Sequence, residues 1–241
     1  MQPDPTNLLK RIDCTAPLIG FYDTPDASPF APLVTPEPNK QRCVFSFYHE
    51  WLKGKTLLIT KDNFGCGGAG HWLCDIETKE REAFIKFLVD GEGLKASRDL
   101  MVRWLDHHRP YQQEHSNVLI GPLSKAQYGY LKSITFYVNP DQLSVLMTGA
   151  QYYSVPSDPP PVIVPFGSGC MELTSLFEDL NVPQAMIGAT DIAMRQYLPP
   201  DLLAFTVTKP MFRQLCELDK GSFLYKPFWN NLRKSRGLPD I

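Results

Sequence analysis

A short apolar segment that leads directly into a glycine-flanked cysteine is the feature that most limits how this chain can fold. Residues 56–60 read TLLIT, and residues 63–74 read NFGCGGAGHWLC. Glycine adopts positive φ without strain and lets the backbone come close to a neighbouring group. The sulfur of Cys66 is therefore expected just beyond the end of a strand. This position indicates a metal site, a cluster site or a reactive thiol.

The same order of elements, a helix, a strand and a glycine-flanked cysteine, occurs twice. The two copies are residues 43–52, 56–60 and Cys66, and then residues 142–152, 162–164 and Cys170. Ligand sites in open α/β sheets lie beyond the carboxyl ends of the strands. We therefore expect Cys66 and Cys170 to be counterparts in two related halves, at one edge of a common sheet.

Helical and extended patterns also alternate elsewhere in the chain. Short apolar runs typical of buried strands occupy residues 118–120, 133–138 and 203–207. The segment NPDQ at 139–142 predicts the start of a helix, because asparagine caps, proline suits the first helical position and glutamine closes a capping box. The alternation predicts an α/β or α+β fold, in which helices pack on a mixed sheet.

Composition limits the class of protein. The chain has 241 residues, of which 43% are hydrophobic and 21% charged, and its net charge is −2. We expect one domain, residues 1–241, with the proline-rich residues 23–40 as an extended arm, since the residue before a proline favours extended backbone. A clustered basic face is missing, which argues against nucleic-acid and membrane-surface partners. No apolar run reaches the length of a membrane-spanning helix.

Six cysteines stand in a chain for which a cytoplasmic location is expected. Residues 1–7 have neither the basic region nor the apolar segment of a secretory signal. In the reducing cytoplasm, cysteines stay free, and grouped cysteines indicate metal binding or catalysis rather than disulfides.

An iron–sulfur cluster is the cofactor that we favour, because clusters are held by cysteine thiolates that come partly from one run and partly from remote positions. The ligands would be Cys43, Cys66, Cys74 and Cys170. Backbone groups near the cofactor would come from Gly65, Gly67, Gly68, Ser168 and Gly169. Zinc is the alternative metal, with Cys66, His71 and Cys74 joined by Cys43 or Cys170 in a Cys₃His site.

A thiol enzyme is the second hypothesis. Ser168 is expected to cap a helix that continues through residues 171–180, which puts Cys170 in its first turn. Free N–H groups and the helix dipole lower the pKa of a thiol at that position. A partner base would be one of the five histidines, His49, His71, His107, His108 or His115. In a third hypothesis the cysteines only pack, and the protein binds a small molecule without chemistry.

Several spaced segments resemble a known family. They are residues 57–73, residues 166–170 (FGSGC), residues 187–195 (IGATDIAMR), and residues 203–207 followed by Met211 and Phe212. Together they resemble domain of unknown function 169, also called ArCR, a family of uncharacterised bacterial and archaeal proteins. The family has no assigned reaction, so the resemblance implies none. We expect a protein that binds a cysteine-ligated cofactor between its two halves, with a small molecule or a redox protein as its partner, and the oligomeric state stays open.

Overall fold

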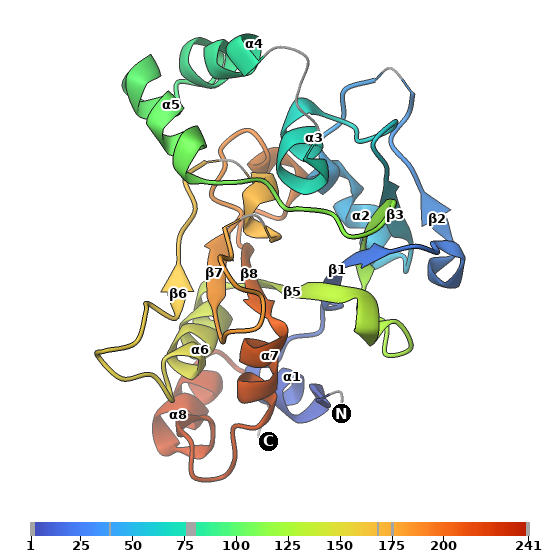
Figure 1. The fold of residues 1–241 in the computed structure, drawn as a ribbon. Coiled ribbons are helices and arrows are strands. Elements are labelled where there is room, and N and C mark those ends of the chain that lie inside the picture. Colours follow the sequence, from blue (N-terminus) through green and yellow to red (C-terminus); the bar gives the residue numbers. More distant parts are fainter. Residues whose placement is uncertain (1–2, 39, 76–80, 168, 175, 240–241) are drawn as a thin grey trace.

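The computed structural model describes residues 3–38, 40–75, 81–167, 169–174 and 176–239. Eight strands in these residues form one mixed sheet in the order β2-β3-β4-β1-β5-β8-β7-β6 (Figure 1). The strands are β1 (Ile19–Thr24), β2 (Leu33–Val34), β3 (Thr56–Ile59), β4 (Asn117–Pro122), β5 (Leu131–Val138), β6 (Val162–Ile163), β7 (Ala185–Gly188) and β8 (Leu203–Thr208). The expected mixed sheet with helices packed on it is confirmed.

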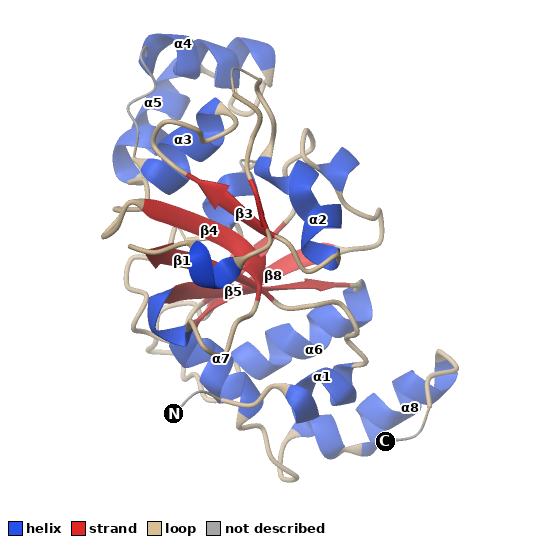
Figure 2. Ribbon diagram, turned by 90° about the vertical axis from the view of Figure 1, so that its right-hand side faces the viewer, coloured by secondary structure: helices blue, strands red, loops and turns tan. Residues whose placement is uncertain are grey.

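Helices cover both faces of the sheet (Figure 2). One face carries α1 (Thr6–Ile12), α6 (Pro140–Ala150), α7 (Lys209–Cys216) and α8 (Pro227–Ser235). The other carries α2 (Tyr48–Leu52), α3 (Gly67–Cys74), α4 (Arg81–Lys86) and α5 (Arg98–His107). Neighbouring strand residues point to opposite faces. Phe21 and Tyr22 of β1 accordingly belong to two separate hydrophobic cores, one on each face.

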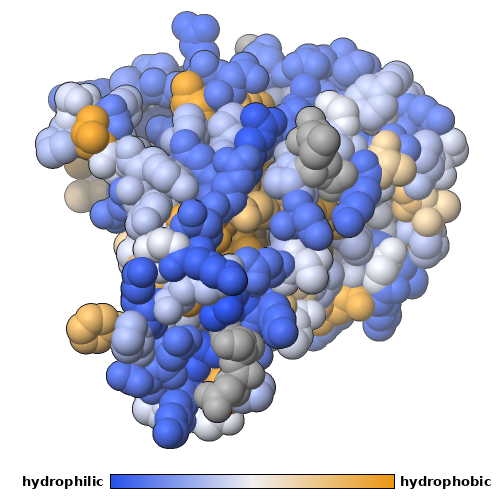
Figure 3. All heavy atoms as spheres, turned by 90° about the horizontal axis from the view of Figure 1, so that it is seen from below, coloured by the Kyte–Doolittle hydropathy of each residue, from blue (hydrophilic) through white to orange (hydrophobic). Residues whose placement is uncertain are grey.

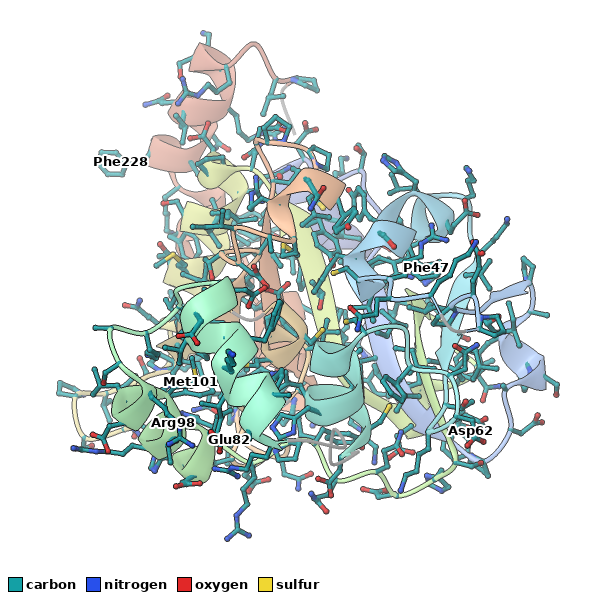
Figure 4. All side chains as sticks on the ribbon, turned by 90° about the horizontal axis from the view of Figure 1, so that it is seen from above. Phe47, Asp62, Glu82, Arg98, Met101 and Phe228 are labelled. Carbon is teal, nitrogen blue, oxygen red and sulfur yellow. The ribbon has the colours of Figure 1, made fainter. Side chains whose placement is uncertain are left out.

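Two local contacts explain where helices begin and how they are joined. Asn139 and Gln142 form the expected capping box at the start of α6, with hydrogen bonds of 2.9 and 3.0 Å. Glu82 of α4 accepts a hydrogen bond from the Arg98 side chain of α5 at 3.0 Å, and the two side chains point toward one another (Figure 4).

The Phe228 side chain points away from α8 and is 89% exposed (Figure 4).

The sheet consists of two halves with the same topology. Read from each edge inward, the order is β2-β3-β4-β1 in one half and β6-β7-β8-β5 in the other. In each half the outermost pair is parallel and the next two pairs are antiparallel, and β1 and β5 pair antiparallel at the centre. Proline also stands two positions after both edge strands, at Pro36 and Pro165. The expected related halves are present.

The correspondence of the cysteines differs from the expected one. Because β2 matches β6, Cys43 is the counterpart of Cys170, each lying in the loop after an edge strand. Cys66 follows β3, which matches β7, so its counterpart is the loop that holds Asp191. The edge strand β2 lies inside the proline-rich residues 23–40 and has only two residues, which left no apolar pattern to recognise.

One expected helix is absent. Residues 171–180 do not form a continuous helix, since Gly169–Glu172 is a short 3₁₀ turn and turns follow it in the described residues up to Leu180. No helix in the described part of the chain is long and apolar enough to cross a membrane. The surface seen from the side of α1 and α8 is largely hydrophilic, with hydrophobic groups confined to small areas (Figure 3).

Candidate functional site

Loops from both halves enclose one cavity of about 630 Å³ on the face that carries α3. The loops after the edge strands contribute Cys43 and Cys170, and the loops after the next strands contribute Cys66 and Asp191. Much of the remaining wall is apolar and comes from Phe45, Ala83, Phe84, Phe87, Leu88, Ala193, Met194 and Tyr197, and its polar side chains are Gln41, Glu92 and Gln196. The cavity therefore holds three sulfurs beside a largely apolar space.

Cys66 stands at the beginning of α3, in an extended conformation that ends the preceding turn. Its sulfur accepts a hydrogen bond from the Cys170 thiol and lies near the backbone N–H groups of Gly68 and Ala69. These donors lower the pKa of Cys66 to about 7, although burial opposes them. A hydrogen bond to the charged form of a thiol favours that form. Much of Cys66 is therefore a thiolate at neutral pH.

Cys170 is the partner that keeps its proton. The hydrogen bond that it donates to Cys66, together with its burial, raises its pKa well above the ordinary value. The lowered pKa therefore belongs to Cys66 and not to Cys170, where the sequence predicted it. The short turn at Gly169–Glu172 offers no long helix dipole, whereas α3 has eight residues. Ser168, the predicted cap and cofactor contact, lies outside the described residues.

Two of the predicted glycines have specific roles in bringing the sulfurs together. Gly65 has a φ of +84°, and an added Cβ would lie 2.6 Å from the carbonyl oxygen of Arg42. Its own carbonyl accepts from the Arg42 N–H at 3.0 Å, so the turn before Cys66 is held against the segment that leads to Cys43. An added Cβ at Gly68 would lie 4.0 Å from the Cys66 sulfur. The glycine thus leaves the approach to that sulfur open.

Gly67 and Gly169 complete the set of predicted glycines. Gly67 is the first residue of α3 and lines the cavity. Gly169 also lines it, but its N–H donates to the Asp191 carboxylate at 3.1 Å. This backbone group therefore positions the Cys170 turn.

Cys43 lines the same cavity and begins the short 3₁₀ turn Val44–Phe47. Burial, together with the charge of Cys66, raises the pKa of Cys43 to about 12. Cys43 is therefore a neutral thiol beside a thiolate. Cys43 and Cys170 come from loops at matching places in the two halves, and Cys66 comes from the turn before α3. These three segments therefore meet at the cavity.

The structure does not bring Cys74 or His71 into this group. Cys74 is the last residue of α3, so it lies roughly 12 Å from Cys66 along the helix axis at 1.5 Å per residue. It is fully buried, and its burial raises its pKa to about 12. The His71 ring packs against Trp72 and Phe84 and does not line the cavity.

Among the described residues, one group of at least three possible metal ligands has all its donor atoms within 4.8 Å of one another. This group consists of Asp23, Glu114 and His115. No cysteine belongs to it, so the compact Cys₃His zinc arrangement is not preformed there. Asp23 is fully buried and accepts from the Tyr111 hydroxyl at 2.8 Å and from the N–H groups of Glu114 and His115 at 2.7 and 2.9 Å. Through these hydrogen bonds, Asp23 of β1 holds the segment that precedes β4 in place.

Asp191 and Arg195 are four residues apart, and each side chain has its own partners. Asp191 accepts from the N–H groups of Gly169 and Ala193 at 3.1 and 2.8 Å. Arg195 donates to backbone carbonyls, including that of Leu202 at 2.5 Å. Asp191 is therefore a cavity residue that ties the Cys170 turn to the loop after β7. Asp191 follows β7 as Cys66 follows β3, and this equivalence between the two halves is the signal that could have identified Asp191.

Glu172 is a further residue that the sequence did not single out. It is fully buried behind Cys170, and one carboxylate oxygen accepts from the Ala189 N–H. The other oxygen has no hydrogen-bond partner among the described residues. Burial raises the pKa of Glu172 to about 8, although the Ala189 N–H opposes it. At neutral pH this carboxyl is therefore largely protonated.

A protein-family model matches most of the chain. The model of domain of unknown function 169, the uncharacterised ArCR family, matches residues 18–217, which include all strands of the sheet and all three cavity cysteines. Comparison with curated proteins and with solved structures found no match. The chain belongs to the uncharacterised ArCR family, domain of unknown function 169.

Proposed function

We propose that this protein is a dithiol enzyme that reduces a small, largely apolar disulfide in the cavity. The observation that carries the proposal is the hydrogen bond from the Cys170 thiol to Cys66, whose pKa is lowered to about 7. A thiolate is the nucleophile in thiol–disulfide exchange, and attack is most efficient when the thiol pKa is close to the ambient pH. Cys66 is the nucleophile and Cys170 the second thiol.

The reaction balances over two exchanges. The Cys66 thiolate attacks one sulfur of the substrate disulfide, whose S–S bond breaks and releases one thiolate. That thiolate takes up the proton of Cys170, and the Cys170 thiolate then attacks the Cys66 sulfur and displaces the second substrate thiolate, which takes its proton from solvent. The substrate disulfide gains two electrons, and the protein is left with a Cys66–Cys170 disulfide. A cellular dithiol must then reduce this disulfide before the next turnover.

Thiol reactivity and product mapping test this proposal. The rate at which iodoacetamide alkylates the native protein should rise with pH. The midpoint of this rise should lie near 7, the pKa of Cys66. This phase should vanish in Cys66→Ser and persist in the matched control Cys74→Ser. Incubation with an aromatic disulfide should release two thiols per chain and leave a Cys66–Cys170 crosslink. Release of one thiol without that crosslink would overturn the dithiol mechanism.

Iron–sulfur binding is a second proposal, favoured by the presence of Cys43 in the same cavity as Cys66 and Cys170. The thiolates of Cys43, Cys66 and Cys170 would hold the cluster, which would supply electron transfer or a Lewis-acidic iron. The predicted fourth ligand Cys74 has no part in this arrangement.

Cys43 separates the two proposals, because only the cluster needs it. Anaerobic reconstitution should yield a brown protein with bound iron and sulfide, and this should be lost in Cys43→Ser but kept in Cys74→Ser. In the dithiol mechanism, Cys43→Ser still forms the Cys66–Cys170 crosslink. A protein that stays colourless and free of iron after reconstitution rejects the cluster.

A further inference from the structure

We propose that a second cavity binds a small molecule through an oxyanion, a carboxylate or a phosphate group, at Lys132 and Lys209. This cavity measures about 940 Å³ and shares no lining residue with the cysteine cavity. Its walls come from the segment after α5, the start of β5, the edge strand β6, the turns around residues 176–181 and the start of α7. The proposal is independent of the thiol chemistry.

The two lysines lie near one another at the ends of neighbouring strands. Ser133 of β5 pairs with Thr208 of β8; Lys132 precedes Ser133, and Lys209 follows Thr208 as the first residue of α7. The charge of Lys132 acts on Lys209, and like charges repel one another. Glu114 neutralises Lys132 at 2.8 Å, but no carboxylate of the described residues lies within salt-bridge distance of Lys209. One ammonium group is therefore available to an anion at this end of the cavity.

A buried hydroxyl lies on the wall beside the lysines. Thr174 is 2% exposed and lines the cavity, and its Oγ1 has no hydrogen-bond partner in the described residues. The preceding Leu173 carbonyl accepts from the Ser133 hydroxyl at 2.5 Å, which holds Thr174 close to the strand that carries Lys132. An unsatisfied buried polar group costs about 1–3 kcal/mol. A ligand oxygen that accepts from Thr174 would remove this cost.

The start of α7 adds a favourable field. Lys209 is the first residue of this eight-residue helix, and the Thr208 side chain caps it by accepting from the Met211 N–H. The N-terminus of a helix carries partial positive charge and favours anions. Burial, and then the charge of Lys132, lowers the pKa of Lys209. A bound anion would favour the charged ammonium and so raise this pKa.

The acidic residues of the cavity have other neighbours. Asp179 accepts from the Asn181 N–H at 2.8 Å, and the charge of Glu178 acts on His108. Glu114 is paired with Lys132. Lys209 is thus a cation of the cavity without a carboxylate within salt-bridge distance among the described residues, as is the more exposed Arg109.

Thermal unfolding at constant ionic strength tests the proposal, with inorganic phosphate and malonate as separate probes. A ligand that binds only the native state raises Tm in a saturable way. At least one probe should do so for the native protein, and the probe that saturates tells whether phosphate or carboxylate is preferred. Lys209→Met should weaken binding at least tenfold, whereas Lys125→Met, at an exposed lysine outside the cavity, should not.

Thr174→Val separates a ligand contact from a structural role. The variant removes a hydroxyl that has no partner, so Tm without ligand should stay unchanged or rise, while the increase caused by the probe should shrink. Cys66→Ser should retain the increase, because the two cavities share no residue. The proposal is overturned if neither probe saturates, or if Lys209→Met and Lys125→Met respond alike.

Discussion

The Cys170 thiol donates a hydrogen bond to the Cys66 sulfur, and this contact gives the two cysteines opposite acid strengths. The two residues are 104 positions apart and belong to different halves of the sheet. Two N–H groups at the start of α3 add to the stabilisation of the Cys66 thiolate. The pair thus depends on how the halves are placed against each other.

Replacing Cys170 should make Cys66 a weaker acid. Without the donated hydrogen bond, burial dominates, and the pKa of Cys66 should rise from about 7 to at least the ordinary range near 8.5. Alkylation of Cys66 at pH 7 should therefore slow by about tenfold in Cys170→Ala. The measurement is the pH profile of alkylation, followed by mass spectrometry of the Cys66 peptide. Cys43→Ala is the control and should change the profile much less, since Cys43 donates no hydrogen bond to Cys66.

Two variants of Asp191 should act in opposite directions. Its negative charge raises the pKa of Cys66, while its carboxylate holds the Gly169 N–H. Asp191→Asn removes the charge and keeps an acceptor, so the alkylation profile should move to lower pH. Asp191→Ala also frees the turn that carries Cys170, so alkylation at pH 7 should slow. Equal profiles for Asn and Ala would show that the hydrogen bond to Gly169 has no influence on the pair.

Glu172 should make stability depend on pH. Its pKa is near 4.5 in the unfolded chain and about 8 in the folded protein, so between these values only the folded state holds the proton. The free energy of unfolding should therefore fall as pH rises from about 5 to about 8 and become level above that. Glu172→Gln cannot titrate and should lack this loss, which amounts to about 2–5 kcal/mol over the window. Urea unfolding of both proteins at pH 5, 6.5 and 8.5 measures the difference, and parallel curves would contradict it.

Gly188 should tolerate no side chain. A Cβ at this position would overlap the Glu172 carboxylate, which sits directly against the end of β7. Gly188→Ala should therefore lower the free energy of unfolding by about 3 kcal/mol or more. Gly129→Ala is the control, because nothing lies within 4 Å of an added Cβ there, and its effect should stay within about 0.5 kcal/mol. Combining Gly188→Ala with Glu172→Ala should restore part of the loss, and a purely additive double variant would contradict the overlap.

The sequence by itself determined the local structure and part of the site. Asparagine, proline and glutamine at residues 139–142 carry a complete helix start, because capping depends only on neighbours in the chain. Apolar runs located the central strands, and the glycines around Cys66 marked a cysteine at the end of a strand. The repeated order of elements led to two related halves, and the spaced motifs led to the family.

Only the tertiary structure decided which cysteines meet and which of them is the acid. The edge strand β2 has only two residues, too few for a pattern, yet its match with β6 sets the correspondence between Cys43 and Cys170. Cys74 is near Cys66 in sequence but at the other end of α3, whereas Cys170 is remote in sequence and in contact. The pKa of a thiol depends on burial and on the groups that donate to it, and both come from segments that meet only when the sheet is assembled.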